Sequence, residues 1–250
     1  SSEIERAFCD GISFDASAIR GFTGEERSDL FLHPDPKTLS ILPWGPEHSR
    51  VIRMFCDIKN PDGSPYPHDS RHILKEAVKT AQDAGIHCNF GPEYEFYLFR
   101  TNENGESNHE PFDHAGYMDI APEDRCENIR REICFALSDM NIHPESSHHE
   151  EGPGQNEIDF RYSDALQSAD NAITFKTVVK TMAMRNGLIA DFSPKPLPGQ
   201  ILLSRPHLRD TAAVRYGAAL KGAGVQPDGA AAVAPAQPDR VSIFPFVGFG

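Results

Sequence analysis

Apolar residues recur at intervals of three and four along three stretches of the chain, and this spacing predicts three helices. The first begins at Ser70, a residue type that caps helices, and ends at Gly85. The second begins at Pro122, which suits the first position of a helix, and continues to Met140. The third and longest covers about 164–186 and ends before Gly187. On it we expect the following residues to be buried: Leu166, Ala169, Ile173, Val178 and Met182.

Short segments rich in β-branched and aromatic residues lie between these helices and are expected to form strands. They cover residues 51–58, 88–99, 144–150, 156–162 and 188–192. Strands and helices alternate irregularly, without the repeated strand–helix–strand order of a doubly wound sheet, so the pattern predicts an α+β fold. No apolar run approaches the roughly 20 residues that a membrane-spanning helix needs.

The charge balance limits the classes of partner. The 250 residues contain 37 acidic and 24 basic side chains and carry a formal charge of −13. Such a surface repels nucleic acid and anionic lipid, but it can gather carboxylates around divalent cations. From Ile201 onward, basic residues slightly outnumber acidic ones, and residues 222–238 are mostly Ala, Gly and Pro. We therefore expect residues 201–250 to form a disordered or poorly packed tail.

The five cysteines are scattered and include no C-x-x-C pair. This pattern is typical of reduced thiols in the cytosol and argues against a disulfide framework or a zinc ribbon. The first residues, Ser-Ser-Glu-Ile-Glu-Arg, lack the basic and then apolar layout of a secretory signal. Together these features predict a cytoplasmic protein.

Two glutamates on one predicted strand give the first chemical signal. In Gly91-Pro-Glu-Tyr-Glu-Phe96, side-chain alternation places Glu93 and Glu95 on one face, with Cα atoms roughly 6.5–7 Å apart. Glutamates are depleted in strands, and two on one face repel each other unless a positive charge lies nearby. A hard divalent cation would supply that charge. The alternative is an exposed strand face whose acids are solvated.

A second group of acids flanks a predicted reversal. The residues Glu151-Gly-Pro-Gly-Gln155 form a turn, so the neighbouring strands should pair as a hairpin and bring Glu150 and Glu157 together. His148 and His149 suggest zinc, but adjacent residues on a strand point to opposite faces and cannot both bind one ion. Ligation by oxygen favours magnesium or manganese, the ions that accompany phosphoryl transfer.

These segments resemble the glutamine synthetase family, in its prokaryotic-like type. The resemblance extends in order over about residues 8–198 and rests on these motifs: Gly91-Pro-Glu-Tyr-Glu-Phe96, His148-His-Glu-Glu-Gly-Pro-Gly-Gln-Asn-Glu157, Ala190-Asp-Phe-Ser-Pro-Lys-Pro196, Gly11–Phe22, Phe55–Gly63, Tyr117–Pro122 and Ile158–Leu166. It implies a β-grasp-like domain over residues 1–67, part of a catalytic domain over residues 68–200, and an unrelated or truncated tail over residues 201–250.

The resemblance also implies a reaction and a set of sites. Members of this family use ATP to convert glutamate into γ-glutamyl phosphate, which ammonia attacks. By resemblance, Glu95, Glu150 and Glu157 bind the Mg²⁺ or Mn²⁺ ion that positions glutamate. Glu93 binds a second ion beside the ATP phosphates, and Glu145 contacts the nucleotide. Asp15 and Tyr117, together with Glu150, match the pocket that binds ammonium, and Asp15 would act across a subunit boundary in a homo-oligomeric ring.

Several alternatives remain open at this stage. Asp15 can be a turn or capping residue, Tyr117 a packing aromatic, and Lys195 is expected to be structural. The Gly-rich loop with a metal-binding histidine that follows Asp-Phe-Ser-Pro-Lys-Pro in the family has no counterpart here, and Ala18 replaces a serine. The chain can therefore be a glutamine synthetase, a related ligase that joins another amine to glutamate, or a non-catalytic fragment or regulatory remnant.

Overall fold

The computed structural model describes residues 2–22, 28–45, 50–194, 196–197 and 221–222. The chain divides into two compact units between His87 and Cys88. The expected tail, residues 201–250, lies outside the described residues except for β14 (Lys221–Gly222), and Lys195 also lies outside them. Among the residues that the structure describes, no helix is long and apolar enough to cross a membrane.

The first unit contains a three-stranded antiparallel sheet in the order β1-β2-β5. Ala16, Leu30, Ile58 and Tyr66 are buried together against it. The elements of this unit are α1 (Ser2–Cys9), β1 (Ile12–Asp15), a 3₁₀ turn (Ala16–Ala18), β2 (Asp29–Pro34), a second 3₁₀ turn (Pro36–Thr38), β3 (Ser40–Ile41), β4 (Ile52–Arg53), β5 (Cys56–Lys59), α2 (Ser70–Asp83) and β6 (Ile86–His87).

Ion pairs, rather than buried apolar side chains, attach the start of α2 to this sheet. Arg71 donates to Asp57 and to Asp35, each at 2.8 Å, and its side chain is only 9% exposed. Asp69 caps the helix by accepting from the Arg71 N–H, and its second oxygen accepts from the Ile58 N–H. The expected helix is confirmed, but Asp69 rather than Ser70 is its N-cap residue, because the Asp69 side chain accepts from the Arg71 N–H.

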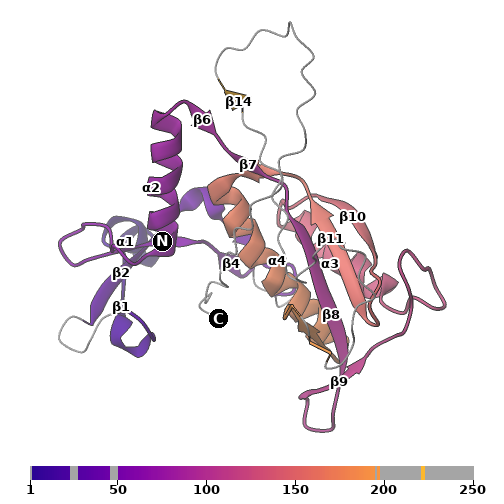
Figure 1. Ribbon diagram of the computed structural model, residues 1–250. Helices are drawn as coiled ribbons and strands as arrows, with labels where there is room; N and C mark the ends of the chain where they lie inside the picture. Colours follow the sequence, from indigo (N-terminus) through magenta and orange to yellow (C-terminus); the bar gives the residue numbers. More distant parts are fainter. Residues whose placement is uncertain (1, 23–27, 46–49, 195, 198–220, 223–250) are drawn as a thin grey trace, which may run out of the picture. The chain divides into compact units, whose positions relative to one another are not determined.

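The second unit is built on a five-stranded antiparallel sheet in which β10, β11, β8 and β13 lie in that order and β9 also pairs with β8 (Figure 1). Figure 1 shows β8 and β11 side by side along the middle of this unit. The elements are β7 (Asn89–Phe90), β8 (Glu93–Thr101), β9 (Ser107–Pro111), α3 (Glu127–Asp139), β10 (Pro144–His149), β11 (Gln155–Phe160), β12 (Ser163–Asp164), α4 (Ala165–Arg185) and β13 (Leu188–Asp191).

One face of this sheet is apolar, and α4 packs against it through Phe175, whose side chain is fully buried. The Phe175 ring contacts Tyr94 at 4.8 Å, Phe160 at 5.7 Å and Phe96 at 6.1 Å between centroids. Ile133 and Leu137 of α3 are likewise fully buried. Burying aromatic side chains of this size stabilises a fold by about 1.5–3 kcal/mol each, so this face contributes substantially to the stability of the unit.

The expected α+β architecture is confirmed, and several boundaries are corrected. The helix expected from Pro122 begins at Glu127, because Pro122 lies in a turn that precedes the helix. The strand expected over 51–58 is interrupted and forms β4 and β5, and the strand expected over 88–99 forms β7 and β8. On α4, Val178 and Met182 are buried, as expected, whereas the expected Leu166, Ala169 and Ile173 are only half-buried.

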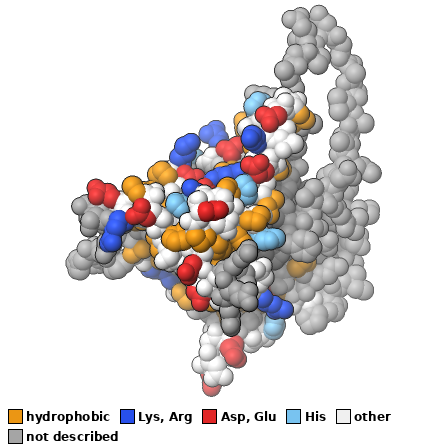
Figure 2. All heavy atoms as spheres, turned by 90° about the vertical axis from the view of Figure 1, so that its left-hand side faces the viewer, with side chains coloured by type: hydrophobic (Ala, Val, Ile, Leu, Met, Phe, Trp, Pro, Cys, Tyr) orange, Lys and Arg blue, Asp and Glu red, His pale blue; other side chains and the backbone are white. Residues whose placement is uncertain are grey.

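Charged and apolar side chains are mixed on the surface shown in Figure 2, where acidic and basic groups lie among apolar ones. The most exposed large apolar residues of the described chain occur on several elements of both units. They are Ile4, Ile73, Tyr117, Met118, Ile120, Phe135, Tyr162 and Met184.

Candidate metal centre

The register of β8 and β11 concentrates acidic side chains on the sheet face opposite to Phe175. Glu157 is directly across from Glu95, and Asp159 is directly across from Glu93. Because side chains alternate along a strand, all four lie on one face, which we call the acidic face. Directly opposed like charges destabilise a sheet, so this arrangement indicates a function rather than a contribution to stability.

The hairpin between β10 and β11 adds a fifth carboxylate, as expected. His148 pairs with Glu157, and His149 pairs with Asn156. Glu150 follows directly, and its N–H donates to the Gln155 carbonyl at 2.8 Å. Glu150 is 3% exposed and Glu157 is 8% exposed, so the two carboxylates on either side of the turn are largely removed from water.

The tight turn between these strands depends on Gly154. Its φ of +65° is a left-handed conformation that glycine adopts without strain. A Cβ atom at this position would lie 2.8 Å from the Leu98 carbonyl oxygen on β8. Only glycine therefore allows the turn to approach β8 closely enough for Leu98 to donate its N–H to the Gly154 carbonyl, at 2.8 Å.

Burial and mutual repulsion shift the protonation of the acidic face. Burial, a hydrogen bond with Glu150 and the negative charges of Asp159, Glu150 and Glu95 raise the pKa of Glu157 to about 9. Burial and the charge of Glu93 raise the pKa of Asp159. Burial, followed by Glu95 and Glu150, raises the pKa of Tyr97 to about 12. A bound cation would favour the charged form of every carboxylate, and it would therefore offset the free-energy cost of ionising Glu157 and Asp159.

His148 and Asp159 belong to this group although sequence reasoning did not select either as a ligand. One potential ligand atom from each of His148, Glu157 and Asp159 lies within 4.8 Å of the others. Asp159 also has a buried oxygen, Oδ1, without a hydrogen-bond partner among the described residues. Its position two residues after Glu157 on the same strand was the available signal. The donors are carboxylate oxygens and one imidazole, a set that fits Mg²⁺ or Mn²⁺.

His149 occupies the opposite face, as side-chain alternation predicted. Its Nε2 lies 2.8 Å from Asp113 Oδ1 and its Nδ1 lies 2.6 Å from the Glu150 carbonyl. Because both ring nitrogens face acceptors, both must donate, and the ring is an imidazolium. Burial alone would lower the pKa of His149, but these hydrogen bonds and the charge of Asp113 raise it.

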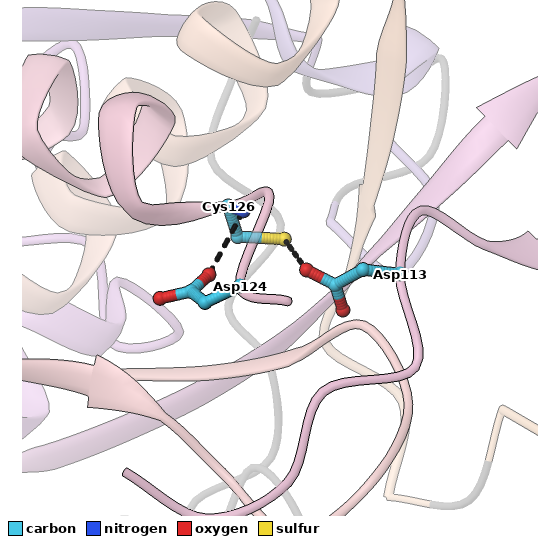
Figure 3. A group of neighbouring side chains, drawn as sticks. All are labelled: Asp113, Asp124 and Cys126. Carbon is cyan, nitrogen blue, oxygen red and sulfur yellow. Dashed lines mark hydrogen bonds between the residues drawn. The ribbon is translucent and has the colours of Figure 1, made fainter. Parts of the chain in front are cut away.

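Asp113, Asp124 and Cys126 form a second buried group with metal-like spacing (Figure 3). Figure 3 shows the Cys126 thiol pointing at Asp113, to which it donates at 3.2 Å, while the Cys126 N–H donates to Asp124 at 2.9 Å. Arg130 pairs with Asp124 at 2.6 Å. Burial and the neighbouring Asp113 raise the pKa of Cys126, so the thiol stays protonated. This group is a satisfied hydrogen-bond network and not a metal centre.

The other expected site residues have different surroundings. Asp15, in the first unit, caps the 3₁₀ turn by accepting from the Ser17 N–H at 2.9 Å and from its hydroxyl at 2.6 Å. Tyr117 is 57% exposed, and its ring contacts His148 edge-on at 5.5 Å between centroids. Glu145 lies near the other end of β10, exposed and 4.0 Å from Arg161. Of the two residues in the second unit, Tyr117 is the one that contacts His148 on the acidic face.

The amino-acid sequence matches two family models. A model described as "Glutamine synthetase, beta-Grasp domain" matches residues 1–61, and one described as "Glutamine synthetase, catalytic domain" matches residues 67–202. Among curated relatives, glutamine synthetases of Clostridium saccharobutylicum and Methanosarcina mazei are each 48% identical over 197 residues, or 79% of this chain. This match covers 44% of each relative, so the chain spans less than half the length of these enzymes.

Solved structures agree with the sequence matches. The cryo-EM structure of Plasmodium falciparum glutamine synthetase has a TM-score of 0.66 and 30% identity, covering 75% of this chain and 42% of that one. A structure described as "Apo GmaS without ligand" has a TM-score of 0.70 and 31% identity, covering 79% of this chain and 46% of that one. The α+β architecture, the acidic hairpin and these matches agree, and the chain belongs to the glutamine synthetase family.

Proposed function

We propose that this chain contributes to the ATP-dependent amidation of glutamate by ammonia. In this reaction the γ-carboxylate of glutamate attacks the terminal phosphorus of ATP and releases ADP, and ammonia then displaces phosphate from the resulting γ-glutamyl phosphate. The proposal rests on one observation above all, the opposition of Glu95 and Glu157 beside the buried Glu150. Family membership supports it, as does the likeness to a solved structure described as a GmaS/ADP complex.

Within this proposal, Glu95, Glu150 and Glu157 hold one divalent cation and Glu93 contributes to a second. When bound, Mg²⁺ or Mn²⁺ neutralises phosphate charge and orients the reacting groups. The protein supplies the carboxylates in fixed positions, because three antiparallel strands and a tight turn carry them. Their repulsion in the metal-free state favours cation binding. Glu145 would contact the nucleotide.

The ammonium pocket is proposed to form from Tyr117 and Glu150, with Asp15 supplied by a neighbouring protomer of a homo-oligomeric ring. Carboxylates attract NH₄⁺ and can accept its proton as the nitrogen becomes a nucleophile. The family models divide between residues 61 and 67, which supports a boundary near residue 67 between a β-grasp-like domain and the first part of the catalytic domain, to about residue 200. Residues 68–87 would then belong to the catalytic domain by sequence while packing within the first compact unit.

Two measurements on the full chain test the proposal. Calorimetric titration with Mn²⁺ should show binding that Glu150→Ala and Glu157→Ala weaken, with Glu103→Ala, an exposed loop residue, as the control. ADP release in the presence of Mg²⁺ should require both glutamate and ammonium. Unchanged Mn²⁺ binding in both glutamate variants would contradict the ligand assignment.

Two other functions remain candidates. Because the chain spans 44% of its curated relatives, it can bind metal without catalysing turnover. It can also belong to a ligase that joins a larger amine to glutamate. Mn²⁺ binding without ADP release from well-folded protein would favour the first, and ADP release that requires an alkylamine instead of ammonium would favour the second. A discrete ring on sizing would support catalysis.

A further inference from the structure

Gln155 connects three of the proposed metal ligands through different groups. It is the first residue of β11 and is 3% exposed. Its carbonyl accepts the Glu150 N–H at 2.8 Å, and Glu157 lies two residues further along the same strand face. Its side-chain Nε2 lies 2.6 Å from Glu95 Oε2 on β8. The proposed metal ligation and ammonium pocket leave this buried side chain without a role.

The orientation of the Gln155 amide is fixed by what surrounds it. Its Oε1 lies 2.8 Å from the backbone nitrogen of Gly152. A backbone N–H can only donate, so the amide oxygen must face Gly152 and the amide NH₂ must face Glu95. An amide NH₂ can only donate, so the hydrogen bond to Glu95 Oε2 fixes the orientation of that carboxylate. Because the amide is neutral, it orients the carboxylate without cancelling the charge that a cation would bind.

Gly152 is required for this arrangement. A Cβ atom at this position would lie 2.6 Å from Gln155 Oε1 and 3.2 Å from the Tyr97 hydroxyl. Any side chain at residue 152 would therefore displace the amide from its position beside Glu95. The two glycines of Gly-Pro-Gly-Gln therefore have different roles. Gly154 permits the turn, and Gly152 leaves space for the Gln155 amide.

We propose that Gln155 is a positioning residue that holds the Glu95 carboxylate in the orientation needed to bind the divalent cation. This inference rests on the proposed function, because it acts through Glu95 as a ligand. Partners that orient metal ligands typically change metal affinity by about 10–100-fold when they are removed. Replacement of Gln155 by methionine, which has a similar length and no amide, should therefore weaken Mn²⁺ binding by at least about tenfold.

A double-mutant cycle on the full chain separates positioning from a general structural effect. Mn²⁺ affinity is measured by calorimetry for the unmodified chain, Gln155→Met, Glu95→Gln and the double variant. If Gln155 acts through Glu95, Gln155→Met costs at least about tenfold alone and close to nothing in the Glu95→Gln background. Gln167→Met, on the exposed side of α4, is the matched control and should leave Mn²⁺ affinity unchanged.

Gly152→Ala provides a second route to the same question if Gln155→Met does not fold. It leaves Gln155 in place but displaces its amide, so it should weaken Mn²⁺ binding and add little to Gln155→Met. The positioning role would be overturned if Gln155→Met lowered Mn²⁺ affinity equally with and without the Glu95 carboxylate. It would also be overturned if neither Gln155→Met nor Gly152→Ala lowered Mn²⁺ affinity. If Glu95→Gln itself leaves Mn²⁺ affinity unchanged, the ligand assignment of the proposed function fails instead.

Discussion

His149 Nε2 lies 2.8 Å from Asp113 Oδ1, and both side chains are almost completely buried behind the acidic face. Asp113 also accepts from the N–H groups of Gly154 and Arg125 and from the Cys126 thiol. Burial would raise the pKa of Asp113, but these hydrogen bonds, first among them that from His149, lower it to about 2. The Asp113 carboxylate thereby connects the loop before α3, through hydrogen bonds, to the hairpin that carries Glu150 and Glu157.

We expect Asp113→Asn to destabilise the protein by about 3–5 kcal/mol, because it leaves a buried imidazolium without its counter-charge. Urea unfolding at pH 7 measures this change, and Asp139→Asn, at the exposed end of α3, is the control. The same variant should lower the pKa of His149, which NMR titration of the ring can follow. A loss below about 1 kcal/mol, typical of a surface ion pair, would contradict a buried pair.

The contribution of Asp113 also predicts how acid affects stability. Its pKa is about 2 in the folded protein and near 3.8 when unfolded, so the unfolded chain binds more protons between these values. The stabilisation is present above about pH 4 and is lost as the pH falls toward 2. Unfolding free energies measured from pH 5 to pH 2 should therefore fall less steeply in Asp113→Asn than in the unmodified chain.

Glu157→Gln should have opposite effects on metal binding and on metal-free stability. It removes a proposed ligand, so Mn²⁺ affinity should fall by at least about tenfold. It also removes a group that must take up a proton on folding at pH 7, so stability in the presence of a chelator should rise by about 1–3 kcal/mol at this pH. Calorimetry and urea unfolding measure the two effects, with Glu103→Gln as the control. A fall in both quantities would indicate a purely structural role.

The pH dependence of metal-free stability should follow the raised pKa of Glu157. The folded protein binds more protons than the unfolded chain between pH 4.5, the ordinary pKa of glutamate, and about 9. Its contribution is therefore fully present below pH 4.5, declines as the pH rises and levels off above about 9. With chelator present, Glu157→Gln should match the unmodified chain near pH 4.5 and exceed its stability most at pH 9. Parallel pH curves for the two proteins would refute the raised pKa.

Gly154→Ala should destabilise the second unit more than an ordinary substitution at a left-handed glycine. Strain at positive φ costs about 1–2 kcal/mol, and the added Cβ would also lie 2.8 Å from the Leu98 carbonyl oxygen. Gly105→Ala, where φ is +78° and nothing lies within 4 Å of the Cβ position, isolates the cost of strain. Thermal unfolding of the two variants should show the larger loss for Gly154→Ala; equal losses would show that the turn can move away from β8.

The local pattern of apolar and capping residues was sufficient to predict most helices and strands, but not where each of them begins and ends. Helical spacing over 70–85 and 164–186 sufficed to locate α2 and α4, because amphipathic periodicity and capping are local properties. Glu150 and Glu157 were expected to meet because a Gly-Pro-Gly turn forces its flanks together. The predicted start of α3 was wrong because Pro122 lies in a turn, and no local preference distinguishes such a proline from one that begins a helix.

Pairing between distant strands decided the remainder. The sequence by itself placed Glu93 and Glu95 on one face of a strand, since alternation is a property of the strand alone. Only the register of β8 against β11 set Asp159 across from Glu93 and brought the Gln155 amide to Glu95, sixty positions away in sequence. The register between two strands depends on burial and turn geometry over the whole sheet, so only the tertiary structure determines it.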